Sequence, residues 1–108
     1  MALEHSAPGV VIDVCGSANH AADSATLVRT EHLEIFRYAL PAGKVVERHN
    51  AAGLMVVQCL EGAVEFTALG KTQKLTPGTM LYLPDREPHA LEALGDTLLL
   101  VTILLHRT

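Results

Sequence analysis

Turn-forming residues divide this 108-residue chain into short segments. Glycine and proline recur about every eight to twelve residues along most of its length, and the runs between them are rich in Val, Leu, Ile, Thr and aromatic residues. This spacing predicts an all-β sandwich or barrel. The turn signals are Pro8-Gly9, Gly16-Ser17, Pro41-Ala42-Gly43, Ala52-Gly53, Glu61-Gly62, Leu69-Gly70, Pro77-Gly78, Pro84-Asp85 and Gly95-Asp96.

The individual runs carry strand patterns. Leu33–Leu40 alternates apolar with charged or polar residues for most of its length, as a half-buried strand does. Leu54–Leu60 is nearly all apolar, which predicts a strand covered on both faces. The runs 63–68 and 72–75 are expected to form a hairpin around Leu69-Gly70-Lys71. The remaining predicted strands are 79–83, 90–94 and 97–105.

The chain is short enough to form a single domain. We expect residues 1–25 to form an N-terminal arm and residues 26–108 the barrel. Val10–Val14 is expected to be an edge or swapped strand, and Ala21–Leu27 is the one stretch with weak helical character. Hydrophobic residues make up 49% of the chain, a high share for so small a body. Part of this apolar surface is therefore expected to lie in a homodimer interface.

Charge and hydropathy exclude several classes of function. The net charge is −4, and the eight Lys and Arg residues are scattered singly, so the chain has no basic stripe for nucleic acid. The longest apolar run, Leu98–Leu105, is interrupted by Thr102 and is far shorter than a membrane span. No signal peptide is visible at the start, and two cysteines do not make a secreted disulfide framework. A cytoplasmic protein without membrane or nucleic-acid partners is the expectation.

Two glycine-framed segments each deliver one histidine. Gly43 is followed after five residues by His49 and later by Gly62, while Gly78 is followed after five residues by Pro84 and then by His89. These frames resemble the two motifs of a small single-domain cupin of the RmlC-like jelly-roll superfamily, over roughly residues 33–105. The resemblance implies a double-stranded antiparallel barrel of jelly-roll type, with a pocket that opens at one end.

The metal-binding motif of the family is incomplete in this sequence. The second histidine of the first motif falls on Ala51, the motif glutamate on Met55 and the glycine of the second motif on Arg86. Of the usual three-His, one-Glu ligand set, only His49 and His89 remain. Two imidazoles suit Zn, Ni, Cu or Fe but hold an ion weakly, since zinc sites normally supply at least three protein ligands. Alternatively, the pair binds a water or the carboxylate of a ligand without metal.

Glu47 is the candidate replacement ligand. It lies two residues before His49, so strict strand alternation places both side chains on one face. With both histidines it would make the two-His, one-carboxylate set that holds non-haem iron with open positions. The alternative is that Glu47 faces solvent, as most glutamates do.

Six further residues are expected to line the pocket. Met55 and Cys59 would either give a histidine site a soft character suited to copper or simply fill the core. Arg86, in the loop before His89, would either clamp a ligand carboxylate or remain in water. The predicted lining residues are Ala51, Met55, Val57, Cys59, Tyr82 and Arg86.

Two functional hypotheses follow. In the first, the barrel pocket binds a small organic ligand, together with a divalent metal (Fe, Mn, Ni, Zn or Cu) held by the two histidines. In the second, the chain is a metal-dependent oxygenase or isomerase that acts on a small organic acid or diketone-like molecule, with the metal as Lewis acid. The sequence contains no nucleophile elbow, no phosphate-binding glycine loop and no dinucleotide fingerprint.

Overall fold

A computed structural model describes residues 7–16 and 23–105. Nine strands make up the regular structure of this part, which contains no helix and therefore none that could cross a membrane. The strands are β1 (Ala25–Arg29), β2 (Leu33–Leu40), β3 (Val45–His49), β4 (Leu54–Glu61), β5 (Val64–Ala68), β6 (Lys71–Leu75), β7 (Met80–Leu83), β8 (His89–Ala93) and β9 (Thr97–Leu104).

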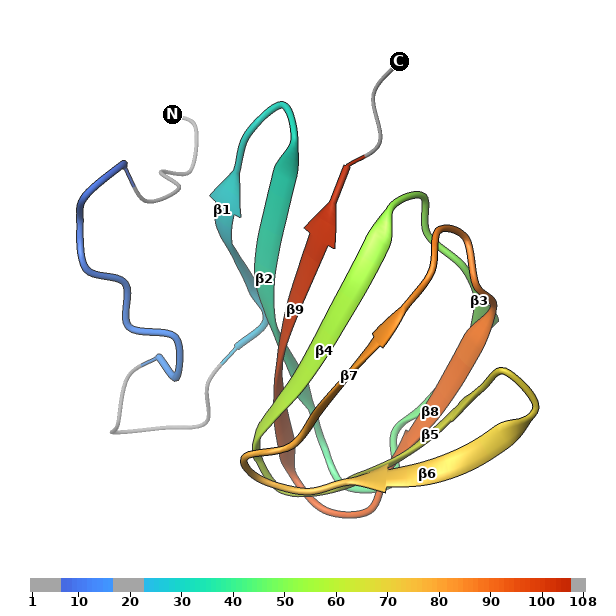
Figure 1. Ribbon diagram of the computed structural model, residues 1–108. Coiled ribbons are helices and arrows are strands. Elements are labelled where there is room, and N and C mark those ends of the chain that lie inside the picture. The colour runs from blue at the N-terminus through green and yellow to red at the C-terminus, as the bar shows by residue number, and fades with distance from the viewer. Residues whose placement is uncertain (1–6, 17–22, 106–108) are drawn as a thin grey trace.

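The strands form two antiparallel sheets that face each other (Figure 1). The larger sheet has the order β1-β2-β9-β4-β7 and the smaller one the order β3-β8-β5-β6. Sequence neighbours often lie in different sheets, as in β3 and β4 or β8 and β9, which is the connectivity of a jelly roll. The all-β prediction is confirmed.

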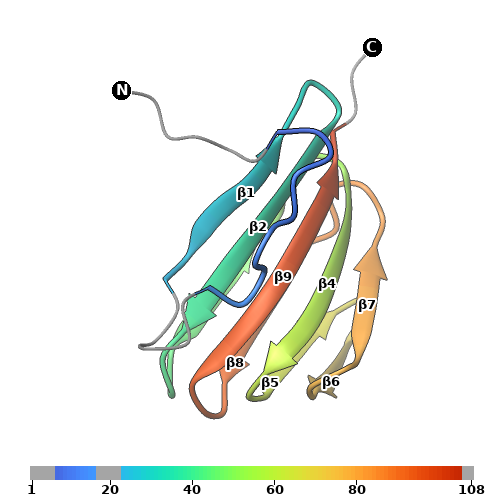
Figure 2. The same cartoon turned by 90° about the vertical axis from the view of Figure 1, so that its left-hand side faces the viewer.

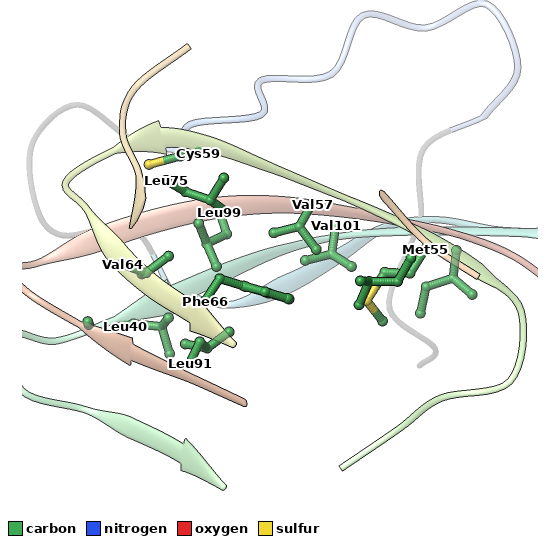
Figure 3. Packing of buried hydrophobic residues seen from close by; sticks show 13 residues of the cluster. Leu40, Met55, Val57, Cys59, Val64, Phe66, Leu75, Leu91, Leu99 and Val101 are labelled. Carbon is green, nitrogen blue, oxygen red and sulfur yellow. The ribbon is translucent and has the colours of Figure 1, made fainter. Parts of the chain in front are cut away.

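The hydrophobic core lies between the sheets. Phe66 of β5 lies in the middle of the buried cluster, with Leu99 and Val101 of β9 and Val57 of β4 around it (Figure 3). The two-residue repeat of a strand explains which side chains enter the core, because β4 buries Met55, Val57 and Cys59 while the residues between them are half-buried. The prediction that this strand is covered on both faces was therefore wrong for its outer face.

The β5–β6 hairpin forms where its turn residues predict it. Ala68 pairs with Lys71, so the loop contains only Leu69 and Gly70. Both have positive φ, 54° and 80°, as a type I′ turn requires. A positive φ is strained for leucine. The pairing of the two strands on either side of the turn holds Leu69 in this conformation.

The N-terminal predictions need correction. Val10–Val14 is not a strand; it runs as irregular chain across the outer face of the larger sheet, where it passes β2 and β9 (Figure 2). Its Val10 and Val11 are 59% and 94% exposed, whereas Ile12 and Val14 are half-buried, and the segment is not paired as a strand. Within the stretch with weak helical character, residues 21 and 22 lie outside the described part, and the chain from Ala25 forms β1. Pairing with β2 overrides the weak helical propensity there.

Candidate functional site: a histidine pair at the end of the barrel

His49 and His89 lie side by side. They face each other directly across the β3–β8 pair, and their ring centroids are 4.3 Å apart with the planes inclined at 58°. His89 is buried, with 4% of its surface exposed, whereas His49 is exposed at the rim. The sequence frames therefore place one histidine inside the barrel and one at its mouth.

Each histidine is oriented in the same way. Nδ1 of His49 lies 3.0 Å from the carbonyl oxygen of Glu47, and Nδ1 of His89 lies 3.0 Å from that of Glu87. A carbonyl oxygen can only accept, so Nδ1 must carry the proton and donate it in both rings. In the neutral imidazole, Nε2 then keeps its lone pair, which is the tautomer that a metal ion or an O–H or N–H donor needs.

Phe66 supports the buried ring. Its ring stacks on His89 with centroids 5.5 Å apart and planes only 7° from parallel. Because Phe66 itself is 2% exposed, this contact fixes the imidazole against the core. Burial lowers the pKa of His89, and the nearby His49 lowers it further, whereas the hydrogen bond to the Glu87 carbonyl opposes the shift. His89 is therefore held as a neutral base.

A small cavity lies between the histidines and the core. Its volume is about 40 Å³, enough for one or two water molecules but far below the several hundred Å³ of a typical small-molecule pocket. Aromatic and aliphatic side chains of both sheets surround it, among them Phe36, Tyr38, Met55, Val57, Phe66 and Leu99. An ion or a water molecule fits this volume, whereas a small organic molecule does not.

Glu47 does not join the pair. Within the described residues, no three His, Cys, Asp or Glu side chains come together in a group that could hold a metal ion. The cause is a bulge in β3: Val46 pairs with Leu91 and His49 with His89, so three steps along β3 match two along β8. The alternation on which the Glu47 prediction rested is interrupted between the two residues, and Glu47 is exposed.

The six predicted lining residues divide into two groups. Met55 and Val57 line the cavity, as alternation in β4 predicts. Tyr82 is 64% exposed, because β7 turns Leu83 inward and Tyr82 outward. Cys59 lies farther along β4, where its thiol contacts the Glu61 carbonyl and burial raises its pKa.

Ala51 and Arg86 do not line the cavity but take part in hydrogen bonds between two loops. The Arg86 amide donates to the Ala51 carbonyl (3.2 Å), and the Gly53 amide donates to the Asp85 carboxylate (2.6 Å). These bonds join the loop after His49 to the loop before His89. Arg86 occupies the position of the motif glycine and keeps the positive φ (62°) that glycine would adopt there.

A larger depression lies at the other end of the barrel. It encloses about 660 Å³ and borders the end of β2, the end of β4 and the start of β9, with Asp23, Glu61 and Asp96 in its wall. Neither histidine borders it. This depression is open to solvent and its three carboxylates are exposed, so the buried and oriented histidine pair at the opposite end is the better candidate for a functional site.

The family comparison agrees with the geometry. The model of the cupin domain matches residues 36–105, which include both histidines and eight of the nine strands in whole or in part. The chain is a cupin. None of the curated proteins matches it in sequence.

Solved structures share the whole barrel. A conserved protein of unknown function from Streptococcus pyogenes is 24% identical with a TM-score of 0.78, and the match covers 100% of both chains. A cupin superfamily protein from Desulfitobacterium hafniense is 22% identical with a TM-score of 0.73, over 77% of this chain and 76% of that one. A salicylate 1,2-dioxygenase variant from Pseudoaminobacter salicylatoxidans is 26% identical with a TM-score of 0.69, over 74% of this cupin and 25% of that chain.

Proposed function

We propose that this cupin binds a divalent transition-metal ion weakly through His49 and His89, and that a small chelating organic ligand completes the coordination from the barrel mouth. The observation that supports it is the matched orientation of the two rings. Both donate Nδ1–H to the carbonyl two residues earlier, which leaves Nε2 free on two imidazoles in contact with each other. This arrangement fixes the tautomer as the outer hydrogen bonds of metal-binding histidines do.

The donor set indicates which ions fit. Imidazole suits Zn²⁺, Cu²⁺ and Ni²⁺, whereas Mn²⁺ and Mg²⁺ prefer carboxylate oxygens. Since Glu47 lies apart from the pair, the nitrogen-binding ions are favoured over Fe²⁺ or Mn²⁺. Such an ion would supply a Lewis acid at the mouth. The protein's own contribution is to orient both imidazoles through their Nδ1–H bonds and to lower the pKa of buried His89, whose ring stacks on Phe66.

The ligand binds outside the cavity. The 40 Å³ space admits no organic molecule, whereas exposed His49 and the two joined loops at the mouth remain accessible. A small molecule with two adjacent oxygen donors, such as an organic acid or a diketone, matches an ion that has only two protein ligands. It would occupy the positions that a complete motif leaves to protein side chains.

Calorimetric titration tests the site. Native protein stripped with EDTA is titrated with Cu²⁺, Ni²⁺ and Zn²⁺, beside a His49→Ala/His89→Ala variant and a His32→Ala control, whose histidine is also exposed but lies in the β1–β2 turn. Native and control proteins should bind about one equivalent, and the double variant should lose this binding. Failure of native protein to bind any of the three ions, or equal binding by the double variant, contradicts the proposal.

A metal-dependent oxygenase or isomerase is the second candidate, because part of a salicylate 1,2-dioxygenase is similar to this chain over most of its length. Metal-loaded protein would then consume oxygen with salicylate or a diketone as probe, and the double variant would not. Metal binding without turnover favours the binding function over the enzyme.

A further inference from the structure

Among the described residues, Tyr38 is the only polar side chain in the cavity wall besides the two histidines. An oxygen atom inside a protein needs about two to four polar partners. Among the side chains of this wall, an oxygen atom that enters the cavity can bond only to the histidine pair and to Tyr38. The other seven wall residues are apolar: Phe36, Met55, Val57, Phe66, Leu91, Leu99 and Val101.

Tyr38 borders the cavity from the sheet opposite the histidines. It belongs to β2 of the larger sheet, whereas the histidines belong to β3 and β8 of the smaller one. The register pairs Tyr38 with fully buried Leu99, so both side chains face the space between the sheets. The Tyr38 ring meets the ring of Phe36 edge to face, with centroids 6.1 Å apart and planes at 63°. This contact holds the phenol ring in place.

The Tyr38 hydroxyl has no partner within the described part of the chain. The residue is nevertheless half-buried, and a tyrosine hydroxyl in such a position normally finds a hydrogen-bond partner. No side-chain oxygen of the described residues is both sealed from solvent and unpaired, so the hydroxyl can be reached by a small molecule. A ligand or a water molecule is therefore the expected partner.

Tyr38 can also donate a hydrogen bond, which the histidines cannot do toward the cavity. Both Nδ1–H groups are engaged with backbone carbonyls at 3.0 Å, so each ring presents only the Nε2 lone pair. The oxygens of a carboxylate or a diketone can only accept. Two Nε2 lone pairs repel such an oxygen unless an ion lies between them, whereas a phenol O–H binds it. Tyr38 is therefore the one side-chain donor in this wall.

We propose that the Tyr38 hydroxyl donates a hydrogen bond to the ligand oxygen nearest the cavity, and thereby selects ligands that bind the ion through oxygen. This inference rests on the proposed function, in which the histidine pair holds the ion and a small ligand completes its coordination. The body of the ligand stays at the mouth, and one oxygen atom fits the 40 Å³ space. An oxygen atom that binds an ion keeps a second lone pair for the hydroxyl, whereas a pyridine nitrogen does not.

Two probes added to the Cu²⁺-loaded protein test this role. Acetate presents an oxygen that can accept the hydrogen bond, and pyridine binds through a nitrogen without a spare lone pair. Tyr38→Phe removes only the hydroxyl and keeps the ring beside Phe36. In this variant acetate should bind about 10-fold more weakly, as expected for the loss of a hydrogen bond to a charged group, and pyridine should bind as it does to native protein. The visible absorption of Cu²⁺ reports both affinities.

The matched control is Tyr82→Phe, which removes the hydroxyl of the other tyrosine in the chain. Tyr82 is 64% exposed and points outward from β7, so this variant should bind both probes as native protein does. The His49→Ala/His89→Ala variant gives the amount of Cu²⁺ bound outside the site. Circular dichroism must show native strand content in every variant counted.

The results separate this inference from the proposed function. If native protein takes up no more Cu²⁺ than the double histidine variant, the proposed function fails and this inference fails with it. If native protein binds Cu²⁺ but does not bind acetate, or binds it no more tightly than Tyr38→Phe does, the inference alone is overturned. An equal loss of acetate and pyridine in Tyr38→Phe overturns it too, because the variant would then have changed the site as a whole.

Discussion

Replacing Gly62 with alanine tests whether the motif glycines are required by space or only by backbone conformation. Gly62 ends the first histidine frame and has φ of 81°. A Cβ built there would contact the Asp96 carbonyl oxygen, and would lie 2.6 Å from Thr97 Oγ1 and 2.7 Å from Thr97 Cα. Gly78 has nearly the same φ, 88°, but a Cβ there meets nothing within 4 Å. The two alanine variants therefore differ in crowding alone.

The structure gives the size of the difference. The left-handed backbone conformation destabilises a folded alanine by about 1–2 kcal/mol relative to glycine. Alanine also lowers the conformational entropy of the unfolded chain, which stabilises the folded state by about 0.4–1 kcal/mol. Gly78→Ala should therefore lower the free energy of unfolding by about 0.5–1 kcal/mol. Gly62→Ala adds overpacking against fixed backbone, about 1–3 kcal/mol more. It also displaces Thr97, whose buried hydroxyl accepts from the Ala63 amide at 3.2 Å.

Urea denaturation at one protein concentration measures both variants. We expect Gly62→Ala to be less stable than Gly78→Ala by about 1–3 kcal/mol, which corresponds to a midpoint about 4 °C lower for each kcal/mol in a thermal scan. A fixed concentration keeps any contribution of self-association to the apparent stability equal in the two variants. Equal losses in the two variants would refute the reasoning, since the crowding at Gly62 would then have no energetic consequence.

Two further predictions concern titratable groups. Because burial raises the pKa of Cys59, a thiol reagent should modify exposed Cys15 quickly and Cys59 only at the rate of unfolding; rapid reaction of both thiols in folded protein would contradict this. Burial also lowers the folded-state pKa of His89 below its ordinary 6.5, so the unfolded chain binds the proton more tightly. Stability in EDTA should then be greatest above about pH 6.5 and fall as the pH drops from there through the folded-state pKa. A His89→Gln variant should lose this part of the slope in urea midpoints between pH 5 and 8, and an unchanged slope would argue against it.

The barrel could be predicted because the turns between its strands are marked by glycine and proline in the local sequence. The resemblance of the two glycine frames to the cupin motifs singles out Gly43, Gly62 and Gly78, and all three have positive φ in the structure, at 84°, 81° and 88°. Glycine adopts such a φ at the least cost, so these turns can be recognised from the local sequence without knowledge of distant contacts. Strand β1 and the irregular course of 10–14 depend instead on pairing with β2 and on the arm's contacts with Arg37, which the local sequence does not encode.

The site was predicted only in part, and the β3 bulge explains why. The spacing of the two motifs predicts that His49 and His89 lie at the same end of the barrel, and their rings are in contact there. Strict alternation along an ideal strand predicts Glu47 beside them, because it lies two residues before His49. One extra residue between Val46 and His49 interrupts that alternation, and nothing in the local sequence marks it as a bulge.

The residues that replace the family's ligands change the kind of site this is. Met55 stands at the glutamate position and puts an apolar side chain in the wall of the 40 Å³ cavity that borders His89. A carboxylate there would raise the pKa of His89 by stabilising the imidazolium; in its absence burial dominates, and the pKa falls. At neutral pH the free Nε2 lone pair is then available without competition from a proton. With Met55 at this position, burial keeps His89 neutral at pH 7, which is the state that the proposed metal binding requires.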